Sequence, residues 1–308
     1  MSGQARTLQP RVLECIRRCV LWSPGDTVAV AVSGGVDSLV LLHLLHRTQS
    51  AHGGKLRVLS ADHGLRDESA AEVEGVRAVA QALDIPFVGV HLEIEPGPNL
   101  AERARDARKD VLLKLGTDRI ATGHHEDDQA ETVLYHLLRG SGMAGLRGMQ
   151  SRDGPWVRPL LFESRAVIQA WAESEGLSWV EDPSNPHSQR GQLRRLIPLL
   201  DEVHGGASRA LARSARLLAR EDALLEGLED DAWRATFSGK GLNRKGLASV
   251  HPALQLRLLK RLIGQLPVRA GTLETVIDGA LRNKGRLDLG GGACLVALDG
   301  VLFVEKAC

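Results

Sequence analysis

The sequence is poor in cysteine, in net charge and in long apolar runs. Its four cysteines are Cys15, Cys19, Cys294 and Cys308, and none of them forms a CxxC pair. This spacing argues against a disulfide framework, a zinc site or an iron–sulfur cluster, and it is typical of a reducing compartment. No apolar run approaches the length of a membrane span, and residues 1–22 lack the apolar core of a signal peptide. The sequence therefore predicts a cytoplasmic protein without a membrane partner.

Two further deficits restrict how the chain could bind a nucleic acid. The formal charge is only +1, so basic contacts must come from local clusters of Lys and Arg. Aromatic residues make up 3% of the chain, which disfavours recognition by extended stacking on nucleobases. An RNA partner would therefore be bound mainly through its shape and its phosphates.

The first half of the chain alternates between short β-type apolar runs and longer helical patterns. With 308 residues and 43% apolar content, the chain is long enough for two domains. Such alternation is typical of βαβ units, whose parallel sheets bind ligands beyond the carboxyl ends of their strands. The sequence predicts an α/β fold with a doubly wound, mostly parallel sheet. The expected strands lie at 27–32, 56–61, 86–92 and 119–123, and the expected helices at 11–21, 39–45, 73–83, 100–115 and 129–138.

The pattern loosens after residue 140, where a glycine-rich segment and a polar, proline-broken loop at 181–191 follow. We expect an N-terminal catalytic domain over residues 1–205. A smaller helical or α+β domain, which begins with a helical linker, is expected over residues 206–308.

The segment Ser33-Gly34-Gly35-Val36-Asp37-Ser38 separates the first expected strand from the helix that follows. Glycine allows close approach of the backbone to a ligand, and the N–H groups at a helix N-terminus form a cradle for anions. Asp37 would repel bound phosphates unless a cation lay between them, which indicates Mg²⁺. Neither the P-loop pattern nor the Rossmann pattern GxGxxG occurs here. The alternative is a glycine turn in which Asp37 and Ser38 only cap the helix.

Further motifs follow this segment in a fixed order. They are ADHGLRDES (61–69), ERARDARKDVL (102–112), TGHHEDDQAETVLYHLLRGSGMAGLRGM (122–149), RPLL (158–161) and WVEDPSN (179–185). Together with SGGVDS they resemble the tRNA(Ile)-lysidine synthetase family of the PP-loop ATP pyrophosphatase superfamily. GRLDLGGGACLVALDGVLFV at 285–304 resembles the small C-terminal domain of that family, in its short form. The resemblance implies that residues 1–205 bind ATP and that residues 206–308 bind the tRNA.

The resemblance implies a ligase that uses ATP and Mg²⁺ to join L-lysine to the wobble cytidine of a CAU-anticodon tRNA(Ile). ATP activates the C2 oxygen of cytosine, pyrophosphate leaves, and the ε-amine of lysine displaces AMP. The resemblance further implies that residues 33–38 hold the ATP phosphates and that Asp37 positions Mg²⁺. Asp62 and His63 would lie beside the adenosine, or would only form a turn before Gly64. A homodimer is left open.

The motif HHEDDQAET at 124–132 is dense in titratable groups. Asp128 and Glu131 are three residues apart, so at a helix start they share a face and suit the ammonium group of lysine. His124 would contact the α-phosphate or carry a proton. The alternative is ordinary capping by Asp127 or Asp128 beside a structural histidine. Two further residues are expected at the helix start or on the surface: His125 and Glu126.

Four other arginines are candidates for binding negative charge near the reaction. Arg105 and Arg108 would neutralise the adenylated intermediate or bind an RNA phosphate, and the alternative is a solvated helix face. Arg190 and Arg194 would contact the α-phosphate or the tRNA.

A second series of arginines has helical spacing: Arg209, Arg213, Arg216 and Arg220. Spacings of four, three and four residues place them on one helical face. This stripe would bind tRNA phosphates, whereas the ordinary alternative is a solvated amphipathic helix.

Other functions remain open at this point. The family usually has tyrosine where Lys109 stands and asparagine where Gly191 stands, and Pro198 comes about one residue early. These departures keep open a catalytically weakened protein that binds ATP or tRNA. A tRNA thiolase of the same superfamily usually needs cysteines near the nucleotide domain, and residues 20–293 have none. An amidotransferase-type synthetase would need a glutaminase partner or domain, and the chain has no such nucleophile motif.

Overall fold

The computed structural model describes residues 3–62, 69–92, 103, 116–180, 189–264, 266, 270–282 and 285–306. It divides into two compact units, Met1–Ala219 and Arg220–Cys308, and the division falls within α11 (Ala207–Thr236). The boundary between functional domains at residues 205 and 206 stays a prediction. None of the helices within the described ranges is long and apolar enough to cross a membrane.

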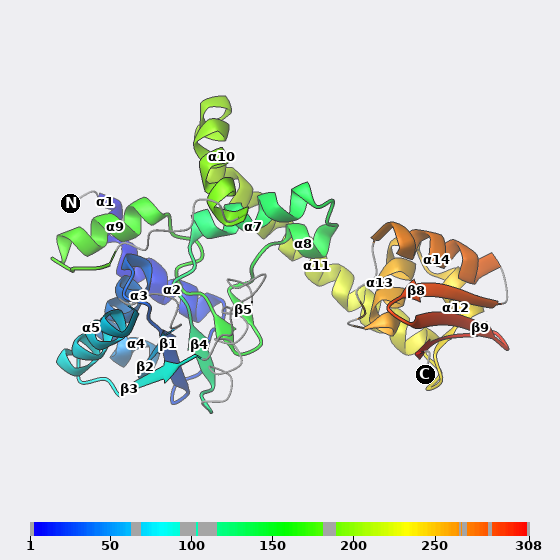
Figure 1. The fold of residues 1–308 in the computed structure, drawn as a ribbon, viewed down its shortest axis with the longest axis horizontal. Helices are drawn as coiled ribbons and strands as arrows, with labels where there is room; N and C mark the ends of the chain where they lie inside the picture. The colour runs from blue at the N-terminus through cyan, green and yellow to red at the C-terminus, as the bar shows by residue number, and fades with distance from the viewer. Residues whose placement is uncertain are drawn as a thin grey trace. The chain divides into compact units, whose positions relative to one another are not determined.

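The first unit is built on a sheet in the order β3-β2-β1-β4-β6-β5 (Figure 1). All its pairs are parallel except the one between β5 and β6. The expected α/β class and mostly parallel sheet are therefore confirmed. The strands are β1 (Thr27–Ala31), β2 (Lys55–Asp62), β3 (Phe87–His91), β4 (Arg119–Ala121), β5 (Arg152–Asp153) and β6 (Trp156–Val157).

The helices of this unit accompany the sheet, as the sequence predicts for βαβ connections. They are α1 (Gly3–Arg6), α2 (Leu8–Arg18), α3 (Val36–Arg47), α4 (Gln49–His52), α5 (Ser69–Ala82), α7 (Glu126–Leu138), α8 (Met143–Leu146), α9 (Arg165–Ser174) and α10 (Gln189–Val203), together with the part of α11 that ends at Ala219. Helix α7 begins three residues before the predicted start at 129, because His125 caps it and acidic residues fill its first turn. The helix expected at 100–115 lies outside the described residues, apart from Arg103.

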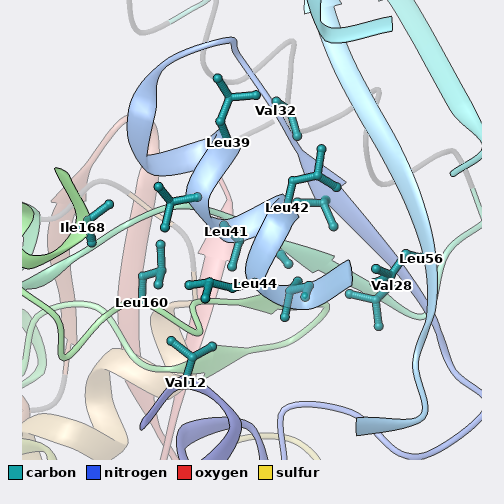
Figure 2. Packing of buried hydrophobic residues seen from close by; sticks show 14 of the residues in the cluster. Val12, Val28, Val32, Leu39, Leu41, Leu42, Leu44, Leu56, Leu160 and Ile168 are labelled. Atoms are coloured by element: carbon teal, nitrogen blue, oxygen red, sulfur yellow. The ribbon is translucent and has the colours of Figure 1, made fainter. Parts of the chain in front are cut away.

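Helix α3 lies at the centre of the hydrophobic core. Leu41, Leu42, Leu44 and Leu45 are completely buried. Figure 2 shows the leucines of α3 among side chains from α2, from β1 and β2, and from the segment that includes Leu160. Each such leucine contributes roughly 1.5–3 kcal/mol through burial, so the helix and the loop before it are held firmly against the sheet.

The strand order places the loop after β1 at the switch point of the sheet. From β1 the chain proceeds outward through β2 and β3, and it returns to β4 on the other side of β1. Loops that leave β1 and β4 in opposite directions open a crevice at the carboxyl ends of these strands, where parallel sheets bind ligands. Residues 33–38 follow β1, and His124 follows β4.

The second unit is a small α+β unit, in agreement with the prediction for the C-terminal part. Its antiparallel sheet has the order β7-β10-β9-β8. The strands are β7 (Leu242–Asn243), β8 (Gly285–Gly290), β9 (Ala293–Leu298) and β10 (Val301–Lys306). The helices are α12 (Arg244–Ser249), α13 (Pro252–Ile263) and α14 (Ala270–Arg282), in addition to the part of α11 that begins at Arg220.

Candidate active site

The loop between β1 and α3 has the local structure that its glycines and serines predict. Gly34 has a φ of +85°, which side-chain-bearing residues rarely adopt. The Ser33 N–H donates to Ser38 Oγ at 3.2 Å, and Ser38 Oγ donates to the Gly35 carbonyl at 2.9 Å. Gly35 is the N-cap of α3 and no side chain caps this end. The positive end of the helix therefore lies at the carboxyl end of β1, with its first N–H groups available to an anion.

Gly123 shows how closely β4 approaches this loop. A Cβ atom on Gly123 would lie 3.0 Å from the Asp37 carbonyl carbon and 3.1 Å from the Ser38 nitrogen. Any larger residue would have to displace the first turn of α3, because both of these neighbours are backbone atoms. Gly123 therefore allows the segment after β4 to pack against the loop at residues 33–38.

Asp37 lies in the first turn of α3, and only one of its two carboxylate oxygens has a partner among the described residues. Its Oδ2 lies 3.6 Å from His125 Nε2. Its Oδ1 is buried and has no hydrogen-bond partner among the described residues. A carboxylate oxygen left in this state loses stabilisation unless a ligand satisfies it. This arrangement fits the predicted magnesium role, because Mg²⁺ in nucleotide sites binds one or two carboxylates and takes other ligands from phosphates and water.

His125 is the central residue of this cluster of side chains, and the sequence reasoning did not assign it to the site. The sequence predicted a helix-start or surface residue; the ring does cap α7, but it is only 5% exposed, so the surface alternative is wrong. Three carboxylates surround it, at 3.4 Å for Asp128, 3.6 Å for Asp37 and 3.6 Å for Asp127. The signal available in the sequence was a histidine directly before the acidic first turn of a helix.

The acidic surroundings determine the charge of His125. Burial lowers its pKa, but hydrogen bonding to Asp127 and Asp37 and the charge of Asp128 outweigh burial and raise the pKa to about 10. The neutral ring accepts the Asp127 N–H at Nδ1 and so caps α7. When the ring is cationic, Nδ1 is protonated and can no longer accept the Asp127 N–H. The positive charge of the ring then attracts the three carboxylates. In return, hydrogen bonding to His125 lowers the pKa of Asp127 to about 2.

This pKa shift predicts a pH-dependent contribution to stability. The pKa of His125 is raised in the folded state, so its contribution is complete below the ordinary value of 6.5 and is lost as the pH rises toward about 10. The His125→Asn variant should therefore lose more free energy of unfolding at about pH 6 than at about pH 10. Urea unfolding of both proteins at the two pH values measures this difference, and equal losses would contradict it.

The predicted acidic pair lies on α7 and is buried. Asp128 and Glu131 are 9% and 3% exposed. Glu131 Oε1 accepts from Arg194 Nε at 2.5 Å, and Arg194 Nη2 lies 3.8 Å from Asp128 Oδ1. Glu131 Oε2 is buried without a hydrogen-bond partner among the described residues. Burial raises the pKa of Glu131, and Arg194 opposes this shift. The pair therefore already attracts one cationic side chain and keeps an oxygen available for another donor.

Arg190 and Arg194 both lie on α10, with Gly191 between them. The sequence placed these arginines at the α-phosphate or the tRNA, whereas the described contacts of Arg194 are with the acidic pair. The positive charge of Arg190 also lies close to Glu131 and, like that of Arg194, opposes the upward shift that burial causes in the pKa of Glu131. Gly191 is buried, so the residue that replaces the family's asparagine lies inside the packed face of α10.

His124 is oriented by the end of β4. Its Nδ1 lies 2.8 Å from Thr122 Oγ1, a hydrogen bond that fixes the plane of the ring. The side chain is half-buried and follows the strand whose end adjoins the loop at 33–38. This position suits the predicted contact with phosphate or the transfer of a proton.

The arginine stripe on α11 is exposed, as expected for either interpretation. All four guanidinium-bearing residues are exposed: Arg209, Arg213, Arg216 and Arg220. Arg209 Nε lies 4.0 Å from Glu126 at the start of α7, and the Arg216 guanidinium lies 5.7 Å from the centre of the Phe162 ring. The first three belong to the unit that carries the loop, and Arg220 begins the second unit.

Some predicted residues are not described by the structure. His63, Arg105 and Arg108 lie outside the described residues, and Asp62 ends β2. Within the described ranges, no group of three or more His, Cys, Asp or Glu side chains is arranged to hold a metal ion. A divalent cation at Asp37 would therefore need phosphate oxygens and water as its other ligands.

Comparison with known proteins gives a consistent result. Residues 6–200 match the family model of the PP-loop domain. The tRNA(Ile)-lysidine synthase of Pseudomonas putida is 38% identical over 247 residues, which make up 77% of this chain and 58% of that protein. The tRNA(Ile)-lysidine synthase of Rhodopseudomonas palustris is 38% identical over 288 residues, which make up 86% of this chain and 83% of that protein.

The chain is shorter than several of these relatives. It spans 49% of the length of the tRNA(Ile)-lysidine synthase of Pseudomonas syringae, to which it is 41% identical. Among solved structures, the U34-tRNA thiolase NcsA from Methanococcus maripaludis has a TM-score of 0.58 at 21% identity, over 70% of this chain and 80% of that one. At this level of identity the similarity shows the fold alone.

Proposed function

Because this chain belongs to the PP-loop family of the tRNA(Ile)-lysidine synthases, we propose that it ligates lysine to the wobble cytidine of tRNA(Ile) with a CAU anticodon. ATP is the second substrate, and AMP and pyrophosphate are the products. The reaction joins the lysine ε-nitrogen to C2 of cytosine through an adenylated tRNA. Its partners are thus lysine and tRNA, while a homodimer and a cytoplasmic location stay predictions.

One observation carries the proposal. A continuous set of contacts joins the loop at 33–38 to a buried acidic pair: His125 Nε2 lies 3.6 Å from Asp37 and 3.4 Å from Asp128. The loop suits a triphosphate and the acidic pair suits an ammonium group. An enzyme that must bring ATP and lysine to one acceptor needs these two subsites side by side.

In the first step, the loop would hold the triphosphate while the C2 oxygen of cytosine attacks the α-phosphorus. Ser33, Gly34, Gly35, Val36, Asp37 and Ser38 are the residues that we assign to the phosphates. The new O–P bond forms as the bond to pyrophosphate breaks. Magnesium, when bound, would neutralise the phosphate charge there. Asp62 and His63 are proposed to lie beside the adenosine.

In the second step, the lysine ε-amine would attack C2, and AMP would leave with the C2 oxygen. Asp128 and Glu131 would orient the lysine side chain while its nitrogen is still an ammonium group. His124 is the candidate to accept the proton that the nitrogen must lose. The positive charge for the departing phosphate would come from arginines: Arg105, Arg108, Arg190 and Arg194.

The tRNA would be bound largely through its phosphates, with the arginine stripe of α11 as a contact surface. Changing Arg213 and Arg216 together to glutamate should weaken tRNA binding and flatten its salt dependence by about 1 in the log–log slope per lost phosphate contact. Filter binding at several salt concentrations measures the slope. Arg234→Glu is a matched control, because Arg234 lies on the same helix and is paired with Asp231 at 2.5 Å. An unaltered slope would remove the stripe from the tRNA interface.

Incubation of a CAU-anticodon tRNA(Ile) with the protein, ATP, Mg²⁺ and labelled lysine, followed by nucleoside analysis, tests the whole proposal. The expected result is labelled lysidine, with AMP release that requires both lysine and the tRNA. ATP binding without AMP formation would indicate a binding protein. Turnover that is independent of lysine but depends on a sulfur donor would indicate a thiolase.

A further inference from the structure

His125 lies between two carboxylates that the proposed function assigns to different substrates. Its ring is buried, and Nε2 lies 3.6 Å from Asp37 Oδ2 and 3.4 Å from Asp128 Oδ2. Asp37 belongs to α3 and Asp128 to α7, so the imidazole connects the two helices that begin at the crevice. Neither step of the proposed reaction uses the His125 imidazole.

The hydrogen bonds around the ring determine which nitrogen carries the proton. Nδ1 accepts the Asp127 N–H at 3.2 Å, which assigns the hydrogen of the neutral ring to Nε2. The cationic ring also has a hydrogen on Nε2. In both charge states, therefore, Nε2 carries a hydrogen and lies 3.6 Å from Asp37 Oδ2 and 3.4 Å from Asp128 Oδ2.

The two carboxylates depend on this N–H to different degrees. Asp128 also accepts the His125 backbone N–H at 3.1 Å and faces Arg194 at 3.8 Å. For Asp37, His125 is the only charged or hydrogen-bonding partner of the carboxylate found within the described residues, and Oδ1 is buried without a partner. Loss of the imidazole would therefore release Asp37 and leave Asp128 largely in place.

The choice of histidine at position 125 indicates a role in addition to capping α7. Serine, threonine, aspartate and asparagine are the preferred N-cap residues, and they serve with a shorter side chain. A buried imidazole is costly unless its polar atoms find partners. Histidine reaches from the cap of α7 to the first turn of α3, which a shorter capping residue does not.

We infer that His125 is a positioning residue for Asp37: its Nε2–H holds Oδ2, fixes the orientation of the carboxylate and leaves Oδ1 for the magnesium–nucleotide. The inference rests on the proposed function, because it presumes that the loop binds ATP. Groups that orient a ligating carboxylate in this way typically affect metal affinity by about 10- to 100-fold.

The variant His125→Asn tests this role, because asparagine still caps α7 but is too short to reach Asp37. Calorimetry with α,β-methylene-ATP, which cannot be cleaved between the α- and β-phosphates, should show half-saturation at about 10- to 100-fold more Mg²⁺. The KM for lysine in lysidine formation should change less than about 2-fold, since Asp128 keeps its other partners.

Two comparisons separate positioning from general damage. In an Asp37→Asn background, His125→Asn should cause no further loss of magnesium-dependent binding beyond about 2-fold. Asp127→Asn alters the contact at Nδ1 and the bond that Oδ2 accepts from the Arg165 N–H, but it leaves the Nε2 side of the ring intact, so that binding should stay near the unaltered value. Equal losses in the two backgrounds, or a parallel loss for lysine, would overturn the inference. Failure of the unaltered protein to bind the nucleotide would instead overturn the proposed function, and the inference with it.

Discussion

Asp37→Asn is expected to lower the rate of pyrophosphate release by roughly 10²- to 10³-fold or more, the range seen when one group that stabilises a transition state is removed. The substitution keeps the size of the side chain and removes its charge. In the structure, Asp37 has a buried Oδ1 without a partner among the described residues, at the start of the helix whose N-terminus forms the proposed phosphate cradle. A neutral amide there would bind a divalent cation poorly, so the charge of the triphosphate would remain unbalanced.

The fold should tolerate this change. Asp127 and Asp128 remain beside His125 in the variant, so the buried imidazole keeps carboxylate partners. The matched control is Asp127→Asn, which removes a carboxylate from the same histidine at its other nitrogen. Pyrophosphate release with tRNA and ATP is the measurement, and circular dichroism checks the fold. A near-normal rate in Asp37→Asn with a slow control variant would contradict the assignment of Asp37.

Glu131→Gln is expected to raise the KM for lysine by about 10- to 100-fold, while pyrophosphate release without lysine changes little. Glu131 is almost fully buried, and its Oε2 has no partner within the described part of the chain. A charged hydrogen bond to an ammonium group at this oxygen would contribute about 1.5–3 kcal/mol. Arg194 would keep a neutral acceptor in place of the carboxylate, so the packing of α10 on α7 should persist.

Asp128→Asn should give a similar but smaller rise in KM, because Asp128 retains the backbone N–H of His125 as a partner. Glu126→Gln is the matched control: Glu126 lies on the same helix, and its carboxylate faces Arg209 at 4.0 Å. Steady-state kinetics with varied lysine distinguish the three variants. If Glu131→Gln kept its lysine KM while losing pyrophosphate release, the acidic pair would belong to the adenylation step instead.

Much of the first unit was predictable because its determinants are local. The alternation of short apolar runs with helical patterns predicted the parallel sheet. The segment SGGVDS predicted a tight loop after β1, in which glycines provide the backbone conformations that lead into α3. The spacing of Asp128 and Glu131 predicted one face of a helix, and both are buried on α7. These features depend on backbone conformation and on periods of two or 3.6 residues, which neighbouring residues encode.

The sequence by itself thus determined the fold class, the loop after β1 and the acidic face of α7. Tertiary structure alone decided that Arg194, 63 residues away from Glu131 along the chain, pairs with that residue, and that His125 reaches Asp37 on another helix. No local pattern contains such pairings, because they depend on how α7 and α10 pack and on how closely Gly123 allows β4 to approach α3. The sequence gives the identity of each side chain. Which side chains pair depends on burial, because burial makes an unpaired polar group costly, and burial exists only once the chain has folded.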